Sequence, residues 1–180
     1  MWPQVAMICG MEIVIGIDPG ATSGWAGVTV EHNPALLLFD AMPMPKPGTP
    51  KDIPPNTPSA VAEAVVESLR RFGHTVVAVA IEDQYLSKNP DSMKKLARNA
   101  GRWEEAWRRL GIPVEWVNAQ VWQSAELGTS RIDSDEVKRR CGMKVLGLWR
   151  KKVGKHSADA ALIARYHAIR LAYRQMRAAP

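Results

Sequence analysis

The sequence predicts an α/β fold in which a mixed β-sheet is flanked by α-helices. Three short apolar, strand-like runs follow one another with only turn-like residues between them, at 13–17, 25–30 and 35–40. Two further strand-like runs, 76–81 and 112–118, alternate with segments of helical periodicity. Because consecutive strands favour an antiparallel meander and strands separated by helices favour βα units, both kinds of pairing are expected in one sheet.

The first predicted helix begins where Thr57 precedes Pro58, since a threonine N-cap followed by proline is typical of a helix start. Its buried face is predicted from apolar residues at helical spacing, namely Val61, Val65, Leu69 and Phe72. Further helices are expected over 90–110, near 119–127, near 134–140 and over 157–176.

The length of 180 residues predicts a single domain, which we place at 12–177. Residues 1–11 are expected to be an N-terminal extension, because the run "MEIVIGID" from Met11 would make a natural start. They lack the basic segment and long apolar core of a signal peptide. The segment 43–58 holds seven of the 13 prolines and predicts an irregular loop. With only two cysteines and no long apolar run, the chain is expected to act in a reducing cytoplasm without crossing a membrane.

The charge of the chain is unevenly distributed. The net charge is +6, and from residue 131 onward 13 lysines and arginines stand against 4 acidic residues. The first 130 residues carry 11 basic and 14 acidic residues. A basic C-terminal third favours a polyanionic partner such as nucleic acid, although a solvated basic surface would have the same composition.

Two acids end predicted strands. Asp18 follows the run at 13–17, and Glu82 follows the run at 76–81. A small residue two positions earlier, Gly16 or Ala80, lies on the same face as each acid and is expected to leave open space beside it. Either acid alone is as well explained as a turn cap. Two acids on neighbouring parallel strands instead favour a ligand site, because ligands bind beyond the carboxyl ends of such strands.

A histidine and an acid lie near the start of the last predicted helix. His156 and Asp159 are three residues apart and therefore project from the same side. Separately, Asp159 could stabilise the helix dipole and His156 could be an exposed loop residue. Together with the two strand-end acids they favour an oxygen-rich site for Mg²⁺, of which two can act on a phosphodiester.

Three blocks of the sequence carry a more specific pattern: "IGIDPGATSGWAGV", "VAIEDQYLSKNPDSMKKLARNAG" and "HSADAAL". In order and spacing they resemble the RuvC family of Holliday junction resolvases, in the RNase H-like superfamily. The resemblance implies an RNase H-like fold with a five-stranded mixed sheet in which the first and fourth strands are parallel neighbours. It further implies a homodimer that resolves four-way junction DNA by paired cuts, in recombination and repair or in phage DNA processing. Branch-migration proteins are possible partners.

The resemblance also implies roles for the four candidate residues. Asp18 would bridge two Mg²⁺ or Mn²⁺ ions, Glu82 would ligate one of them, and Asp159 would complete the site. His156 stands where many relatives have an aspartate, so one formal negative charge is absent. Its imidazole could ligate a metal, position the attacking water, or stabilise charge on the phosphate.

Other residues are candidates for DNA binding. By resemblance, Tyr85 would stack on a base of the opened junction, and Lys88 and Asn89 would lie near the scissile strand. The helix at 90–110 would form the dimer interface. The basic C-terminal region supplies the expected phosphate contacts: Arg131, Lys138, Arg139, Arg140, Lys144, Arg150, Lys151, Lys152 and Lys155.

The sequence departs from the family at Trp122, where many relatives have a lysine within Gln-Val-Lys-Gln. Arg131, Lys144 and Lys155 are alternative sources of that positive charge.

Three other functions are compatible with parts of the sequence. The turn after Asp18 is also typical of actin-like ATPases and sugar kinases, but the chain is short for such a protein and shows no second copy of the motif. An RNase H-like nuclease acting on RNA or on other branched DNA is the main alternative. A catalytically inactive DNA-binding relative is the third.

Overall fold

The computed structural model describes residues 10–43, 57–83, 90–129 and 133–178. Five strands of these residues form one sheet in the order β3-β2-β1-β4-β5. Strand β1 pairs antiparallel with β2, and β2 with β3, whereas β1–β4 and β4–β5 are parallel pairs. Their bounds are β1 Glu12–Asp18, β2 Thr22–Thr29, β3 Leu36–Pro43, β4 Thr75–Asp83 and β5 Val114–Asn118. The predicted meander and mixed sheet are therefore confirmed, with the first and fourth strands as parallel neighbours.

Within the described ranges, five helices accompany the sheet. Their bounds are α1 Pro58–Arg71, α2 Pro90–Arg109, α3 Ala119–Leu127, α4 Ser134–Trp149 and α5 Lys155–Ala178. The predicted N-cap of α1 is confirmed, since the Thr57 hydroxyl accepts a hydrogen bond from the Ala60 amide. Within the ranges that the structure describes, no helix is long and apolar enough to cross a membrane.

Two helices are longer than the sequence predicts. Helix α4 continues past residue 140 because Cys141 and Val145 extend its buried face, and it ends where Arg150 adopts a left-handed conformation with φ of 53°. Helix α5 begins at Lys155, where the Ala158 amide donates to the Gly154 carbonyl. His156 therefore lies in the first turn of a helix and not in a loop.

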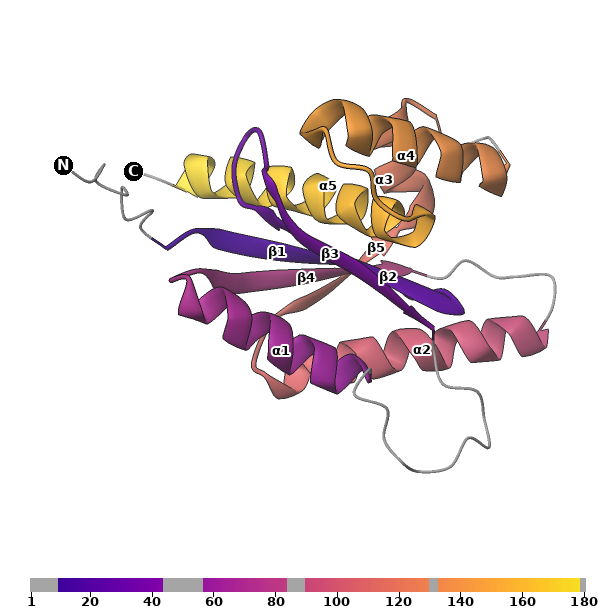
Figure 1. Cartoon of the computed structure of the whole chain (residues 1–180), viewed down its shortest axis with the longest axis horizontal. Helices are drawn as coiled ribbons and strands as arrows, with labels where there is room; N and C mark the ends of the chain where they lie inside the picture. The colour runs from indigo at the N-terminus through magenta and orange to yellow at the C-terminus, as the bar shows by residue number, and fades with distance from the viewer. Residues whose placement is uncertain (1–9, 44–56, 84–89, 130–132, 179–180) are drawn as a thin grey trace.

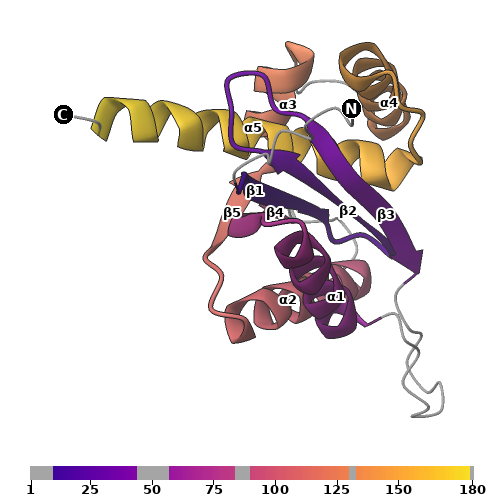
Figure 2. The ribbon, with the colours of Figure 1, turned by 60° about the vertical axis from the view of Figure 1, so that its left-hand side comes forward.

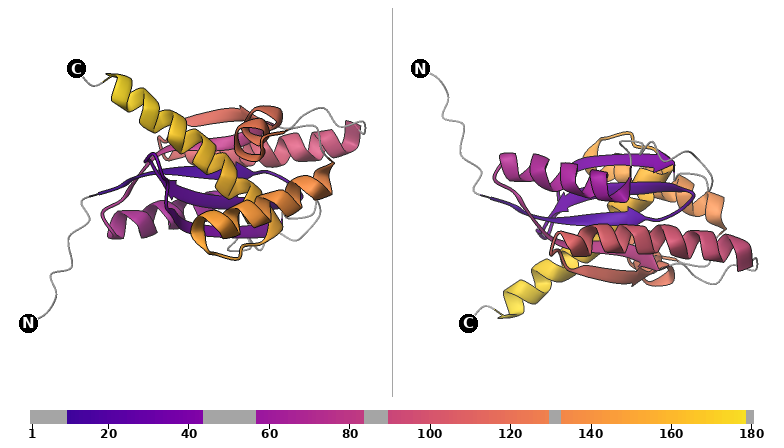
Figure 3. Two further views of the ribbon diagram at one scale, coloured as in Figure 1. Left: turned by 90° about the horizontal axis from the view of Figure 1, so that it is seen from above. Right: turned by 90° about the horizontal axis from the view of Figure 1, so that it is seen from below.

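The helices lie on both faces of the sheet (Figure 1). Helices α3, α4 and α5 lie on one side and α1 and α2 on the other, as the rotated view also shows (Figure 2). Helix α5 crosses its face obliquely (Figure 3). Alternation along β1 supplies both cores: Val14 packs on the α5 side, while Ile13, Ile15 and Ile17 pack with Trp103 and Trp107 of α2.

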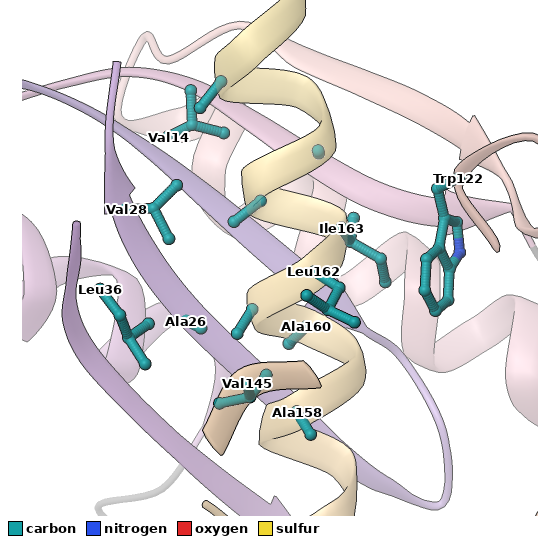
Figure 4. Packing of buried hydrophobic residues seen from close by; sticks show 14 of the residues in the cluster. Val14, Ala26, Val28, Leu36, Trp122, Val145, Ala158, Ala160, Leu162 and Ile163 are labelled. Atoms are coloured by element: carbon teal, nitrogen blue, oxygen red, sulfur yellow. The ribbon is translucent and has the colours of Figure 1, made fainter. Parts of the chain in front are cut away.

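Two glycines allow α5 to pack directly on the strands. A Cβ atom at Gly16 would overlap the backbone of Ala160, and one at Gly24 would overlap the backbone of His156. Small residues of the helix, among them Ala158 and Ala160, belong to the core on this face of the sheet (Figure 4). The expectation that Gly16 leaves open space beside Asp18 was therefore wrong, because the helix backbone fills that space. The close packing instead brings the start of α5 to the end of β1.

Candidate active site

The two strand-end acids lie on the face that α5 covers. Asp18 is the last residue of β1, and Glu82 lies one residue before the end of β4. The parallel register pairs Ile17 with Ile81, so the two acids follow matched positions on neighbouring strands. Both alternate with side chains of the opposite core and therefore point toward the helix side. This is the carboxyl-end position that the sequence predicts.

Helix α5 adds its two candidates to the same place. The Nδ1 atom of His156 lies 3.3 Å from the Oδ2 atom of Asp18. Asp159 is 7% exposed and Asp18 is 9% exposed, so both carboxylates are buried. The structure thus brings Asp18, His156 and Asp159 together, although they come from opposite ends of the sequence. The glycine contacts described above allow this approach.

The carboxylate of Asp159 is poorly compensated. Burial, and next the negative charge of Asp18, raise its pKa from an ordinary 3.8 to about 6. The pKa of Asp159 is lowered by the Cys141 thiol, Lys138 and His156. Its Oδ1 atom is buried without a hydrogen-bond partner among the residues that the structure describes. A buried carboxylate oxygen of this kind is costly to leave alone, so an added cation would stabilise it.

The Cys141 thiol on α4 lies among the carboxylates. Burial raises its pKa, and the charge of Asp159 raises it next, followed by the charges of Glu82 and Asp18. The thiol is therefore held in its neutral form and acts as a hydrogen-bond partner of Asp159. Sequence reasoning missed this residue, because a lone cysteine on a helix gives no signal of what it contacts.

Glu82 makes a contact that the sequence did not predict. The indole Nε1 of Trp122 on α3 donates a hydrogen bond of 2.9 Å to the Oε1 atom of Glu82. Trp122 is 1% exposed and belongs to the core on the α5 side. The residue that departs from the family pattern is therefore in direct contact with a candidate catalytic acid.

The four candidate residues fit a hard divalent cation in their chemistry. They supply three carboxylates and an imidazole, and Asp159 has a buried oxygen without a partner within the described ranges. Among the residues that the structure describes, no three His, Cys, Asp or Glu side chains lie as close together as the ligands of a bound ion. Asp18, Glu82 and Asp159 supply the carboxylates of this set, and Glu82 is held toward Trp122.

The DNA-binding candidates have varied surroundings. Tyr85, Lys88, Asn89 and Arg131 lie outside the described residues. The remaining candidates differ in whether they pair with another residue of the chain.

On α4, Arg139 and Arg140 both pair with Glu136, at 2.6 Å and 2.7 Å. Lys144 pairs with Glu126 at 2.8 Å, and Lys151 donates to the Leu36 carbonyl at 2.8 Å.

The other four candidates also lie at or near the surface. Arg150, Lys152 and Lys155 are exposed, and Lys138 is half-buried. Lys138 is also the lysine of this set whose charge lowers the pKa of Asp159.

The sheet order, with acids at the ends of β1 and β4, is that of the RNase H-like fold. A model of the family "Crossover junction endodeoxyribonuclease RuvC" matches residues 14–167. The chain therefore belongs to the RuvC family, whose members are divalent-metal-dependent nucleases in general. The resemblance in the sequence is confirmed, and the ATPase or kinase alternative is not supported.

Individual relatives agree with the family assignment. A crossover junction endodeoxyribonuclease RuvC of Acinetobacter baylyi is 28% identical over 160 residues, which cover 88% of this chain and 83% of the relative. A Thermus thermophilus RuvC structure has a TM-score of 0.64 at 25% identity, covering 91% of this chain and 96% of that one. T. thermophilus RuvC in complex with a Holliday junction substrate has a TM-score of 0.65 at 24% identity, with 92% and 96% covered.

Proposed function

We propose that this chain is a Holliday junction resolvase that cuts two symmetric strands of four-way junction DNA with the help of Mg²⁺ or Mn²⁺. The observation that carries the proposal is the buried, poorly compensated pair of Asp18 and Asp159 at the meeting point of β1 and α5. Membership of the RuvC family and the likeness to a relative in complex with a junction support the choice of substrate.

Asp18, Glu82 and Asp159 would hold the cations, with two ions at each site as the preferred arrangement. When bound, the ions supply electrostatic stabilisation of the phosphodiester in an in-line displacement. The protein's own contribution is to hold acidic oxygens together in a buried place where their repulsion favours cation binding.

His156 has a positioning role in this proposal. Its Nδ1 lies 3.3 Å from Asp18 Oδ2, so a proton on that nitrogen would fix the orientation of the Asp18 carboxylate. An imidazole also lowers the formal negative charge of the site relative to the aspartate found in many relatives. Loss of activity in His156→Ala with intact junction binding would support this role, and near-normal activity would make His156 a bystander.

We further propose that the protein acts as a homodimer with α2 at the subunit interface. A C2 dimer presents two identical sites, which suits the near two-fold symmetry of a four-way junction. Paired cuts at symmetric positions then leave ends that a ligase can join.

The basic residues of the C-terminal third would contact phosphates, and Tyr85, Lys88, Asn89 and Arg131 are proposed to contact DNA near the cut. Junction affinity should therefore fall as salt rises. The protein would act on DNA in the cytoplasm, with branch-migration proteins as possible partners.

A cleavage panel tests the proposed function. A mobile four-way junction, a fork, a flap, linear duplex and an RNA–DNA hybrid are compared with Mg²⁺ or Mn²⁺ and with chelator. We expect paired, cation-dependent cuts in the four-way junction. Preference for the hybrid would overturn the resolvase assignment in favour of an RNase, and tight junction binding without any cutting would indicate an inactive relative.

A further inference from the structure

The contact between Trp122 and Glu82 links the core to the active site. The Trp122 indole is 1% exposed and belongs to the same core as Leu162 and Ile163 of α5 (Figure 4). Its nitrogen lies on the side of the ring turned away from Ile163 (Figure 4). That nitrogen donates the 2.9 Å hydrogen bond to Glu82 Oε1.

A buried indole is well suited to fix a flexible carboxylate. The glutamate side chain has several rotatable bonds, whereas the packed tryptophan ring has few ways to move. The indole N–H is a neutral donor, so it occupies one acceptor position of Glu82 without cancelling its charge. The indole therefore restricts the orientation of Glu82 without adding a positive charge beside its carboxylate.

Two other buried tryptophans show that such a bond is not a general feature of this protein. Trp103 and Trp107 are 0% exposed on the opposite side of the sheet. Their Nε1 atoms have no hydrogen-bond partner among the residues that the structure describes. Burial alone thus does not provide a tryptophan N–H with an acceptor here, and the bond to Glu82 reflects the specific placement of α3.

We propose that Trp122 is a positioning residue that holds Glu82 in the orientation in which it binds the catalytic cation. This inference rests on the proposed metal-dependent nuclease function and adds a residue to it. Groups that orient a metal ligand typically change metal affinity or activity by about 10- to 100-fold when removed. Loss of the indole N–H is therefore expected to weaken cation binding while junction binding remains.

The test compares Trp122→Phe with Trp107→Phe. Both changes keep a buried aromatic ring and remove an N–H, but only the first N–H contacts a proposed ligand. The dissociation constant of Mn²⁺ from the full chain without DNA is measured by calorimetry, together with the Mn²⁺ concentration for half-maximal junction cleavage. We expect both values to rise about 10- to 100-fold in Trp122→Phe and to stay near wild type in Trp107→Phe.

The outcomes separate this inference from the proposed function. If Trp122→Phe binds Mn²⁺ and cleaves as the wild type does, the positioning role is overturned and the nuclease function stands. If wild-type protein neither binds Mn²⁺ nor cuts a junction, the proposed function fails and this inference fails with it.

A second measurement uses the unmodified chain and so does not depend on how a variant folds. In protein with ¹⁵N-labelled tryptophan, small amounts of Mn²⁺ broaden the indole resonances that lie near the bound ion. The resonance of Trp122 should broaden first, and those of Trp103 and Trp107 on the other side of the sheet should persist. An unaffected Trp122 resonance at saturating Mn²⁺ would contradict the proposal.

Discussion

Two buried acids on the same side of the sheet have opposite surroundings. Glu126 of α3 is 6% exposed and Asp159 of α5 is 7% exposed. Glu126 accepts two hydrogen bonds of 2.8 Å and 2.6 Å from Arg165, and Lys144 lies 2.8 Å from its carboxylate. Asp159 instead faces the like charge of Asp18 and keeps a buried oxygen without a partner within the described ranges.

The difference separates an ion network that stabilises the fold from one that is incomplete without an added group. Arg165 and Lys144 come from α5 and α4, so their pairs with Glu126 join three helices and balance its charge within the chain. Asp159 and Asp18 lack that balance, and their burial makes the missing charge more costly. A carboxylate pair left in this state suits the binding of a cation from solution.

The largest expected effect comes from a substitution in the incomplete cluster of Asp18 and Asp159. Asp18→Asn removes a charge at the centre of the proposed metal site, so single-turnover junction cleavage should fall by more than about 100-fold, beyond what loss of a supporting residue causes. Junction affinity in chelator should stay close to wild type. Glu82→Gln should act in the same direction.

The control for Asp18→Asn is Asp40→Asn, the same substitution at an exposed position of β3. It should cleave normally. A wild-type rate in Asp18→Asn would remove that residue from the proposed site.

The next largest effect is expected from a substitution in the compensated network around Glu126. Glu126→Gln leaves Arg165 and Lys144 without their acidic partner, and the free energy of unfolding should fall by about 3 kcal/mol, the lower end of the cost for a buried pair. Urea unfolding measures the loss. Cleavage by the folded fraction should be retained, because Glu126 has no part in the proposed metal site.

Glu136→Gln is the matched control for Glu126→Gln, since Glu136 pairs with Arg139 and Arg140 at the surface. Its stability should change little, because exposed ion pairs contribute little. Equal stability losses in the two variants would show that the network around Glu126 has no special role.

A pH titration without metal tests the charge on Asp159. Its folded-state pKa of about 6 lies above the ordinary 3.8, so its contribution to stability is fully present below about pH 4 and is lost as pH rises through about 6. The difference in unfolding free energy between wild type and Asp159→Asn should change by about 3 kcal/mol across this window. A difference that is constant with pH would show that Asp159 is not strained by burial.

The smallest expected effect concerns Lys138, whose charge lowers the pKa of Asp159. Lys138 interacts electrostatically with Asp159, whereas Arg139 is paired with Glu136. Lys138→Gln should weaken junction binding modestly and lower the salt dependence by about one phosphate contact. Arg139→Gln should do less, and the reverse order would assign the DNA-contacting face of α4 to Arg139.

The sequence predicted the elements and the acids, because both depend on local patterns. Alternation along β1 and β4 placed Asp18 and Glu82 on one face, and the spacing of His156 and Asp159 placed them on one side of a helix. The full length of α4 was missed, since the buried positions of Cys141 and Val145 become apparent only when α5 is in place.

Contacts between distant residues were not predictable from such patterns. Trp122 and Glu82 are 40 residues apart, and their bond depends on how α3 sits against the end of β4. The role of Gly16 was misassigned for a similar reason: a missing side chain shows that something can approach, but not whether a ligand or a helix does.

Cleavage of a mobile four-way junction by wild type and Asp159→Asn, as Mn²⁺ is titrated, tests the central claim most directly. The account predicts that wild-type protein cuts two symmetric strands only when the cation is present. It predicts that Asp159→Asn binds the junction without cutting it. Cutting by wild type in chelator, or a wild-type rate in Asp159→Asn, would contradict the assignment of this carboxylate cluster as the metal-dependent active site.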